Sequence, residues 1–89
     1  MTFDDLCRDF NRRRPKGPII KRIPWFTARW SDDVRCIRQM LVRHLKDFGY
    51  EYLDNMGTIW FLYQGAWKCA DYKVDGETVQ FFLCEFIEN

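Results

Sequence analysis

The sequence predicts one α+β domain: a short N-terminal helix, a basic connector, and one main helix packed on an antiparallel β-meander of three or four strands. Two stretches of helical apolar spacing precede Gly49, and β-rich runs separated by turn residues follow it. A chain of 89 residues has room for one modest core. We therefore predict a single domain over residues 1–89, divided into a short helix (1–13), a basic and apolar connector (14–30), and the helix plus sheet (31–89).

The N-terminal segment has the signature of a short amphipathic helix over about residues 3–12. Thr2 can cap its first turn, and Asp5 stands at the capping-box distance. Leu6 and Phe10 follow with the spacing of one helical face. The Arg-Arg-Arg-Pro run then ends the helix, because the residue before a proline is pushed out of the helical region.

The connector, residues 14–30, is expected to be extended or looping and to be broken at Pro24. It is too apolar to be a free linker, so we expect it to lie against its own domain. Its apolar residues are Ile19, Ile20, Ile23, Trp25, Phe26 and Trp30.

The main helix is predicted over about residues 32–48. Ser31 is a favourable N-cap residue, and Gly49 is a natural residue just past the C-terminus. Apolar residues recur at steps of three and four along one stripe. The stripe consists of Val34, Ile37, Leu41, Leu45 and Phe48.

Two turn sequences set the expected strand register. Gln64-Gly65 and Asp75-Gly76 both suit two-residue hairpin loops, which would place Tyr63 opposite Ala66 and Val74 opposite Glu77. A short strand is expected at residues 50–53, followed by a four-residue turn at 54–57. Longer strands are expected at residues 58–63, 66–74 and 77–86.

This register divides the sheet into two faces. The face expected to meet the main helix holds Ile59, Phe61, Tyr63, Ala66, Ala70, Tyr72, Val79, Phe81 and Leu83, with Lys68 as the misfit. The opposite face is half apolar and carries Trp60, Leu62, Trp67, Cys69, Phe82 and Cys84. We expect the second face either to be covered by residues 19–30 or to be left open as a binding surface, and we favour the cover, because large exposed apolar patches are uncommon.

Charge is divided unevenly along the chain. Residues 1–50 carry twelve Lys/Arg and six Asp/Glu, whereas residues 51–89 carry two and seven. Clustered arginines bind carboxylates or phosphates in planar, bidentate geometry, so a basic surface suits either partner class. The partner-binding residues we predict are Arg12, Arg13, Arg14 and Lys16 in the connector region and Arg35, Arg38 and Arg43 on the main helix. The alternative is that the helix arginines pair with Asp32, Asp33, Asp47 and the acidic sheet, and only tie the domain together.

A second candidate contact face consists of Trp60, Trp67 and Phe82. Aromatic side chains on a sheet can stack single-stranded bases. The sequence lacks the glycine- and phenylalanine-rich strand of an RNA-recognition motif. An open face of this kind is therefore more typical of a protein interface, where Trp, Tyr and Arg serve as anchors.

The residues required for catalysis or for cofactor binding are sparse. His44 is the single histidine and has no Ser or Asp at a spacing that suggests a relay. The four cysteines (Cys7, Cys36, Cys69 and Cys84) form no C-x-x-C pair, and the glycines form no phosphate loop. We expect no enzyme, no metal site and no cofactor. With no signal peptide and no apolar run long enough to cross a bilayer, we expect no membrane partner and a cytoplasmic location.

The function predicted from these features is that of a small non-catalytic binding protein that docks on, and modulates or inhibits, a larger protein or nucleoprotein assembly. The alternative is a small RNA- or single-stranded-DNA-binding domain that uses the basic N-terminal arm and the aromatic sheet face. In size and composition the chain is similar to accessory proteins that bacteriophages and mobile elements use against host machinery. That likeness is one of general character and rests on no motif.

Overall fold

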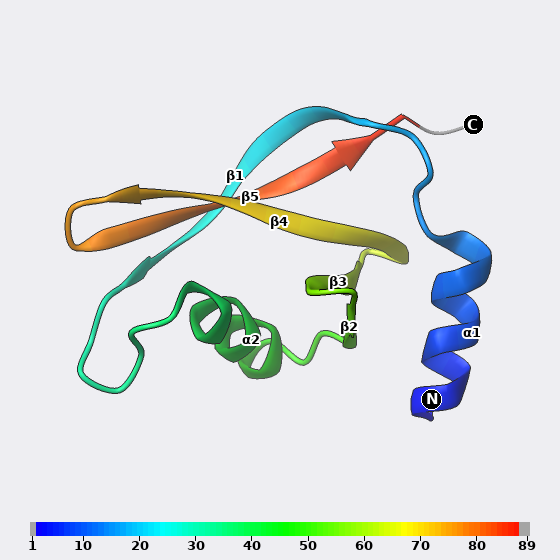
Figure 1. Cartoon of the computed structure of the whole chain (residues 1–89), viewed down its shortest axis with the longest axis horizontal. Helices are drawn as coiled ribbons and strands as arrows, with labels where there is room; N and C mark the ends of the chain where they lie inside the picture. The colour runs from blue at the N-terminus through cyan, green and yellow to red at the C-terminus, as the bar shows by residue number, and fades with distance from the viewer. Residues whose placement is uncertain (1, 88–89) are drawn as a thin grey trace.

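The structure, a computed structural model, describes residues 2–87 as two helices and a five-stranded antiparallel sheet. The predicted α+β class is confirmed, whereas the sheet has more strands than the three or four predicted. The strand order is β1-β5-β4-β3-β2 (Figure 1). The elements are α1 (Phe3–Arg13), β1 (Ile19–Arg29), α2 (Ile37–Asp47), β2 (Tyr52–Asn55), β3 (Thr58–Tyr63), β4 (Ala66–Asp75) and β5 (Thr78–Phe86).

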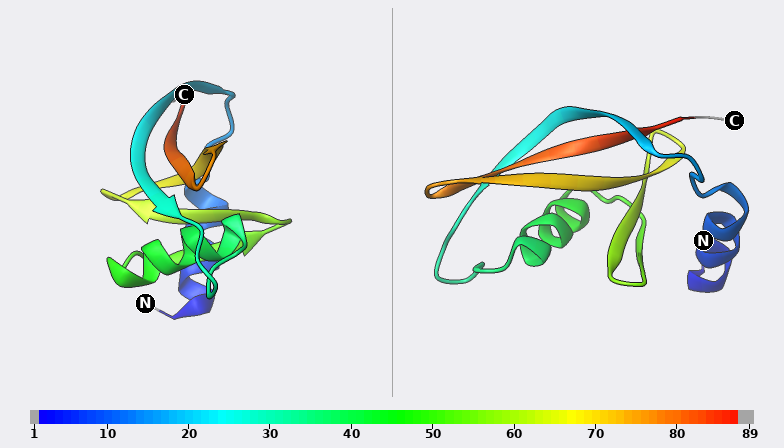
Figure 2. Two further views of the ribbon diagram at one scale, coloured as in Figure 1. Left: turned by 90° about the vertical axis from the view of Figure 1, so that its left-hand side faces the viewer. Right: turned by 45° about the horizontal axis from the view of Figure 1, so that its top comes forward.

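Strand β4 joins two parts of the sheet that run in different directions. Residues 66–69 pair with β3, whereas residues 70–75 pair with β5. The β2–β3 hairpin is seen nearly end-on in the view in which β1, β4 and β5 run across the picture (Figure 1). The views of Figure 2 show α2 on one side of this hairpin and α1 on the other. The hairpin therefore contributes side chains to two separate cores.

The larger core lies between α2 and the sheet face that was predicted to meet the main helix. Phe61, Val79 and Phe81 are at most 1% exposed there, and Leu45 of α2 is fully buried against them. Burial of one such side chain stabilises the fold by about 1.5–3 kcal/mol. Phe48, the last residue of the predicted stripe, is 67% exposed, because α2 ends before it.

The opposite face is covered by α1, which corrects both alternatives proposed for it. Phe10 is 2% exposed and places its ring 5.3 Å from that of Trp60 and 5.1 Å from that of Trp67. Leu6 is buried in the same cluster. An eleven-residue helix is marginal in isolation. Its apolar stripe therefore needs a partner, and this face supplies one.

Most of the predicted connector is a strand, and this accounts for the fifth strand of the sheet. Residues 19–29 form β1, which pairs with β5 along its length. Pro24 removes a ladder donor, which argued against a strand. β1 lies at the edge of the sheet, however, where one side of a strand has no neighbour and a proline is tolerated.

A bulge beside Pro24 places two consecutive aromatic rings on one face. Pro24 lies opposite Phe82 and Phe26 lies opposite Phe81, so Trp25 is an extra residue on β1. Regular alternation would send Trp25 and Phe26 to opposite faces. Because of the bulge, both rings pack against the core beneath α2, with Phe26 stacked on Phe81 at 4.6 Å.

Helix α2 begins at Ile37, five residues later than predicted. The hydroxyl of Ser31 accepts a hydrogen bond from the Val34 N–H at 3.1 Å, as a cap would. The Ser31 N–H donates in turn to the Val34 carbonyl at 3.2 Å. These two bonds close a separate turn, so the helix starts after Cys36, whose side chain makes no cap hydrogen bond.

The loop of the β4–β5 hairpin is Gly76-Glu77 instead of Asp75-Gly76, because Asp75 lies opposite Thr78. Gly76 has a φ of +60°, as the first central residue of a type II′ turn requires. The predicted pairs are therefore displaced by two residues. Side chains alternate with a period of two, so the predicted faces are kept although the individual pairs differ.

The other two hairpin loops each have two residues with positive φ, as type I′ turns require. Gln64 and Gly65 have φ values of +52° and +80°, which confirms the loop predicted between β3 and β4. Met56 and Gly57 have values of +53° and +88°. The turn before β3 is thus two residues long and not four, since Asn55 already pairs with Thr58.

Candidate functional site

The predicted basic residues at the end of α1 surround one carboxylate, that of Asp9. Arg12 donates to Asp9 at 2.9 Å, and Arg13 donates through Nε at 3.0 Å and through a terminal nitrogen at 2.6 Å. Trp67 of β4 adds a hydrogen bond from its indole N–H at 2.9 Å. The hydrogen bonds from Arg13 and Trp67 hold the pKa of Asp9 well below its usual range. Asp9 therefore joins α1 to the sheet as well as to its own arginines.

Arg13 also spans the gap between α1 and the β3–β4 turn. Its guanidinium donates to the carbonyl oxygen of Gly65 at 2.8 Å, and its Nε also donates to the Asp9 carboxylate at 3.1 Å. This side chain has two internal partners. We infer that Arg13 mainly positions α1.

Arg14 and Lys16 are placed differently from Arg12 and Arg13. The guanidinium of Arg14 lies over the ring of Phe10, 5.1 Å from its centroid. Lys16 follows Pro15 and is exposed. Within residues 2–87, neither side chain has a carboxylate at ion-pair distance. Their charge is thus not neutralised by the described part of the fold.

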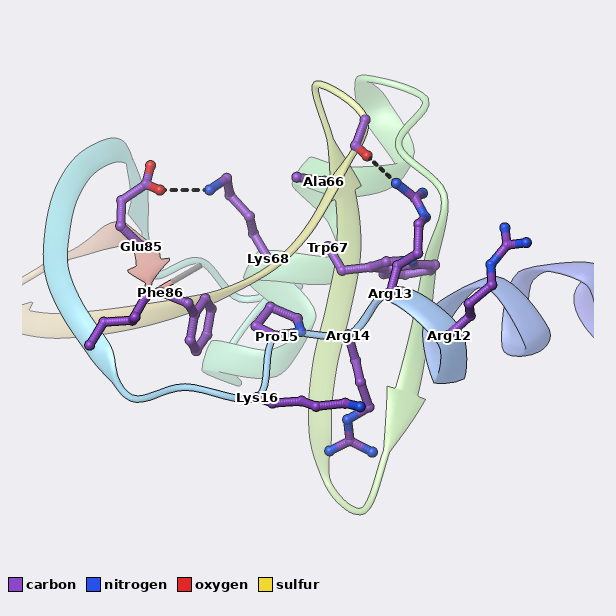
Figure 3. Close-up of a pocket in the computed structure, with 12 residues that line it drawn as sticks. Arg12, Arg13, Arg14, Pro15, Lys16, Ala66, Trp67, Lys68, Glu85 and Phe86 are labelled. Carbon is purple, nitrogen blue, oxygen red and sulfur yellow. Dashed lines mark hydrogen bonds and ion pairs between the residues drawn. The ribbon is translucent and has the colours of Figure 1, made fainter. Parts of the chain in front are cut away.

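These residues line a cleft between the end of α1 and strands β4 and β5, which we call the basic cleft (Figure 3). Its volume is about 540 Å³. Lys68 and Glu85 form an ion pair of 2.8 Å on its far side, and Pro15 and Phe86 lie between that pair and Lys16 in the view of Figure 3. The lining is Arg12, Arg13, Arg14, Pro15, Lys16, Gly65, Ala66, Trp67, Lys68, Glu85, Phe86 and Ile87.

Sequence reasoning missed three polar members of this site: Asp9, Lys68 and Glu85. Asp9 stands four residues before Arg13, a spacing that predicts an ion pair on a helix. Lys68 was noted only as a misfit on the core face. Its pairing with Glu85 depends on how β4 and β5 lie together, and no local signal in the sequence marks it.

The basic residues of the α2 region lie elsewhere. Arg35 pairs with Asp32 at 3.2 Å, and Arg38 pairs with Asp54 and reaches the carbonyl of Gly57 at 3.4 Å. Two of the predicted helix arginines therefore have the internal partners that the alternative interpretation expected. Arg43 instead lines shallow hollows along α2, one of about 390 Å³.

The structure does not bring the two basic groups together. Arg13 contacts the turn that follows β3, whereas Arg38 contacts the turn that precedes β3. A strand of six residues separates these turns by roughly 20 Å. The basic cleft and the α2 surface are therefore two separate candidate sites.

The aromatic face is largely closed. Trp60 and Trp67 are 9% and 3% exposed, because α1 lies over them. Phe82 is only partly buried and lies opposite Pro24 at the edge strand. The three rings therefore do not form one open stacking surface.

His44 and the paired cysteines have surroundings typical of core residues. The imidazole stacks on Phe26 with 3.6 Å between ring centroids, and burial lowers its pKa. Cys69 and Cys84 are buried in the cluster beneath α1. The neighbouring Cys84 thiol and burial raise the pKa of Cys69, so its reactive thiolate is disfavoured.

Residues 2–87 contain no group of three or more His, Cys, Asp or Glu side chains that could hold a metal ion. Neither described helix, at eleven residues each, is long and apolar enough to cross a membrane. No protein-family model, curated protein or solved structure matches the chain.

Proposed function

We propose that this chain is a small non-catalytic binding protein that docks through its basic cleft on a larger protein or nucleoprotein assembly and modulates or blocks it. The observation that carries the proposal is that Arg14 and Lys16, which have no carboxylate at ion-pair distance among residues 2–87, line a cleft of about 540 Å³. Binding sites are typically concave and combine apolar walls with a few placed polar groups. The basic cleft has both features.

The charge distribution supports docking on a charged partner. Most of the cationic lining comes from the basic N-terminal segment, whereas strands β4 and β5 supply Lys68 and Glu85. A predominantly cationic site steers an acidic partner during encounter and raises the association rate. By contrast, the alternative nucleic-acid function loses the stacking surface on which it depended, since Trp60 and Trp67 lie under α1.

The test is capture of a partner from an extract of the native host with the tagged full chain. The binding variant is Arg14→Glu/Lys16→Glu, and the matched control is Lys46→Glu/Lys73→Glu, which makes the same change of charge outside the cleft. We expect a protein that survives nuclease treatment to be retained by the wild type and the control, and lost with the cleft variant. Equal retention by all three chains would contradict docking through this cleft.

A nuclease-sensitive capture would instead favour the RNA- or single-stranded-DNA-binding alternative. In that case, direct affinity for an oligonucleotide should fall linearly on a plot of log affinity against log salt. Little direct affinity for nucleic acid is the result that we expect.

A further inference from the structure

We infer that the basic cleft binds an extended acidic segment of a partner protein, with carboxylates on Arg14 and Lys16 and an apolar side chain between them. This inference rests on the proposed docking function and names the chemistry of that contact. It follows from the charge, the lining and the size of the cleft.

The charge of the cleft favours a ligand that carries a small number of anionic groups. Five cationic side chains line it, and two carboxylates contact them. Asp9 is engaged by Arg12 and Arg13, and Glu85 is engaged by Lys68. Arg14 and Lys16 are left without such a partner among the described residues, and each can bind one carboxylate of a visiting chain.

The walls of the cleft favour a peptide over a phosphate backbone. Pro15, Phe86 and Ile87 contribute apolar surface to the lining of the cleft. An aliphatic side chain can bury against that surface, whereas phosphate groups would lose hydration there without compensation.

The size of the cleft is consistent with the same occupant. At about 540 Å³ it falls in the range of sites that enclose a ligand of a few residues. An extended peptide advances about 3.3 Å per residue and alternates its side chains. Two acidic residues that flank one aliphatic residue would therefore send both carboxylates to one wall, toward Arg14 and Lys16, and the aliphatic side chain to the opposite wall, where Phe86 and Ile87 lie.

The probe is a blocked peptide, acetyl-Asp-Glu-Leu-Glu-Asp-amide, titrated into the full ¹⁵N-labelled chain at low salt. Its uncharged analogue, acetyl-Asn-Gln-Leu-Gln-Asn-amide, and a hexathymidine oligonucleotide are titrated in parallel. We expect the acidic peptide to bind, with amide shifts confined to the cleft and with affinity falling as salt rises. Equal binding of the uncharged peptide, or tighter binding of the oligonucleotide at the same amides, would overturn the inference.

The variants test whether Arg14 and Lys16 make the contact. Arg14→Gln/Lys16→Gln should lower the affinity for the acidic peptide about tenfold or more, since two charge-assisted contacts are lost. Lys46→Gln/Lys73→Gln removes the same charge elsewhere. Its affinity for the acidic peptide should stay within about twofold of that of the wild type, because a change in net charge far from the site acts only through screened long-range electrostatics. Equal weakening in both variants, or none in either, would contradict the inference. Thermal unfolding and the amide spectrum of each variant without peptide confirm that it is folded.

Failure of this inference is distinguishable from failure of the proposed function. If the cleft variant still loses its cellular partner while no acidic peptide shifts the cleft amides, docking stands and the acidic-segment inference is wrong. If the peptide binds as expected but no partner is retained, the docking function fails and the chemistry of the cleft stands.

Discussion

The two helices have the same length, but they are held to the sheet by different forces. α2 covers a face whose central side chains, Phe61, Val79 and Phe81, are apolar and fully buried. α1 buries only Leu6 and Phe10 of its own residues. Cys7 packs against the same cluster, and the polar part of the attachment runs through the Asp9 carboxylate to Trp67 and through Arg13 to the Gly65 carbonyl. Hydrophobic burial thus dominates on one side, and hydrogen bonds and charge carry a large share on the other.

This difference has a consequence for function. The basic cleft exists only while α1 is docked, because α1 and the residues just after it supply one wall and β4 and β5 supply the other. Local unfolding begins where few apolar contacts hold an element. The weaker of the two helices is therefore the one that builds the candidate site, and the two attachments should respond differently to the same kind of mutation.

The largest expected effect is on the α2 side. Phe81→Ala removes a ring that is 1% exposed and stacks on Phe26. Phenylalanine-to-alanine changes in a core cost about 3–5 kcal/mol, a large part of the stability of a small domain. Urea unfolding followed by circular dichroism should show a much lower midpoint or no folded baseline. A midpoint close to wild type would contradict the assignment of this face as the main core.

Phe10→Ala should lower the free energy of global unfolding less than Phe81→Ala does, and it should clearly destabilise the docking of α1. The ring contacts Trp60, Trp67 and the Arg14 guanidinium. Because the ring stabilises the fold through the docking of α1, the cost of its removal cannot exceed the free energy that docks this helix. Hydrogen exchange should show lost protection in α1 with protection kept in α2 and β5. Uniform loss of protection across the chain would show that the two sides unfold as one unit.

The polar attachment of α1 should be sensitive to acid. The lowered pKa of Asp9 means that its ionised form stabilises the folded state above the ordinary aspartate pKa, about 3.9. This contribution is lost as the pH falls from that value through the lowered pKa. Urea midpoints between pH 7 and pH 2 should therefore fall less steeply in Asp9→Asn than in wild type.

Asp71 also contributes to the pH dependence of stability in that experiment. Its pKa is also lowered, chiefly by the hydrogen bond from Arg22, so some acid sensitivity remains in Asp9→Asn. Identical pH profiles for the two proteins would show that Asp9 is not a stabilising contact.

The smallest effect is expected at the exposed pair of Arg35 and Asp32. Both side chains are highly exposed, at 76% and 99%, and the pair lies 3.2 Å apart. Exposed pairs contribute about 0–1 kcal/mol. Arg35→Ala should therefore leave the midpoint of thermal unfolding nearly unchanged. A clear decrease would show that the turn before α2 depends on this pair.

The sequence predicted most of the helices and strands and the cationic residues at the end of α1. Thr2 and Asp5 form the predicted capping box, and the two faces of the sheet follow from alternation. Clustered arginines drew attention to the residues that line the basic cleft. The partners of those arginines were harder to foresee, because Gly65 and Asp54 lie 52 and 16 positions away from Arg13 and Arg38.

By itself, the sequence determined the class of the fold, the first helix, the two longest hairpins and the segregation of charge, since each depends on local spacing, turn chemistry or composition. Only the tertiary structure decided that residues 19–29 pair with β5, that α1 covers Trp60 and Trp67, and that Lys68 and Glu85 complete the cleft. The physical reason is that edge pairing, helix docking and cross-strand ion pairs join residues that are far apart in the chain. Their free energy depends on surfaces that exist only after the sheet has formed.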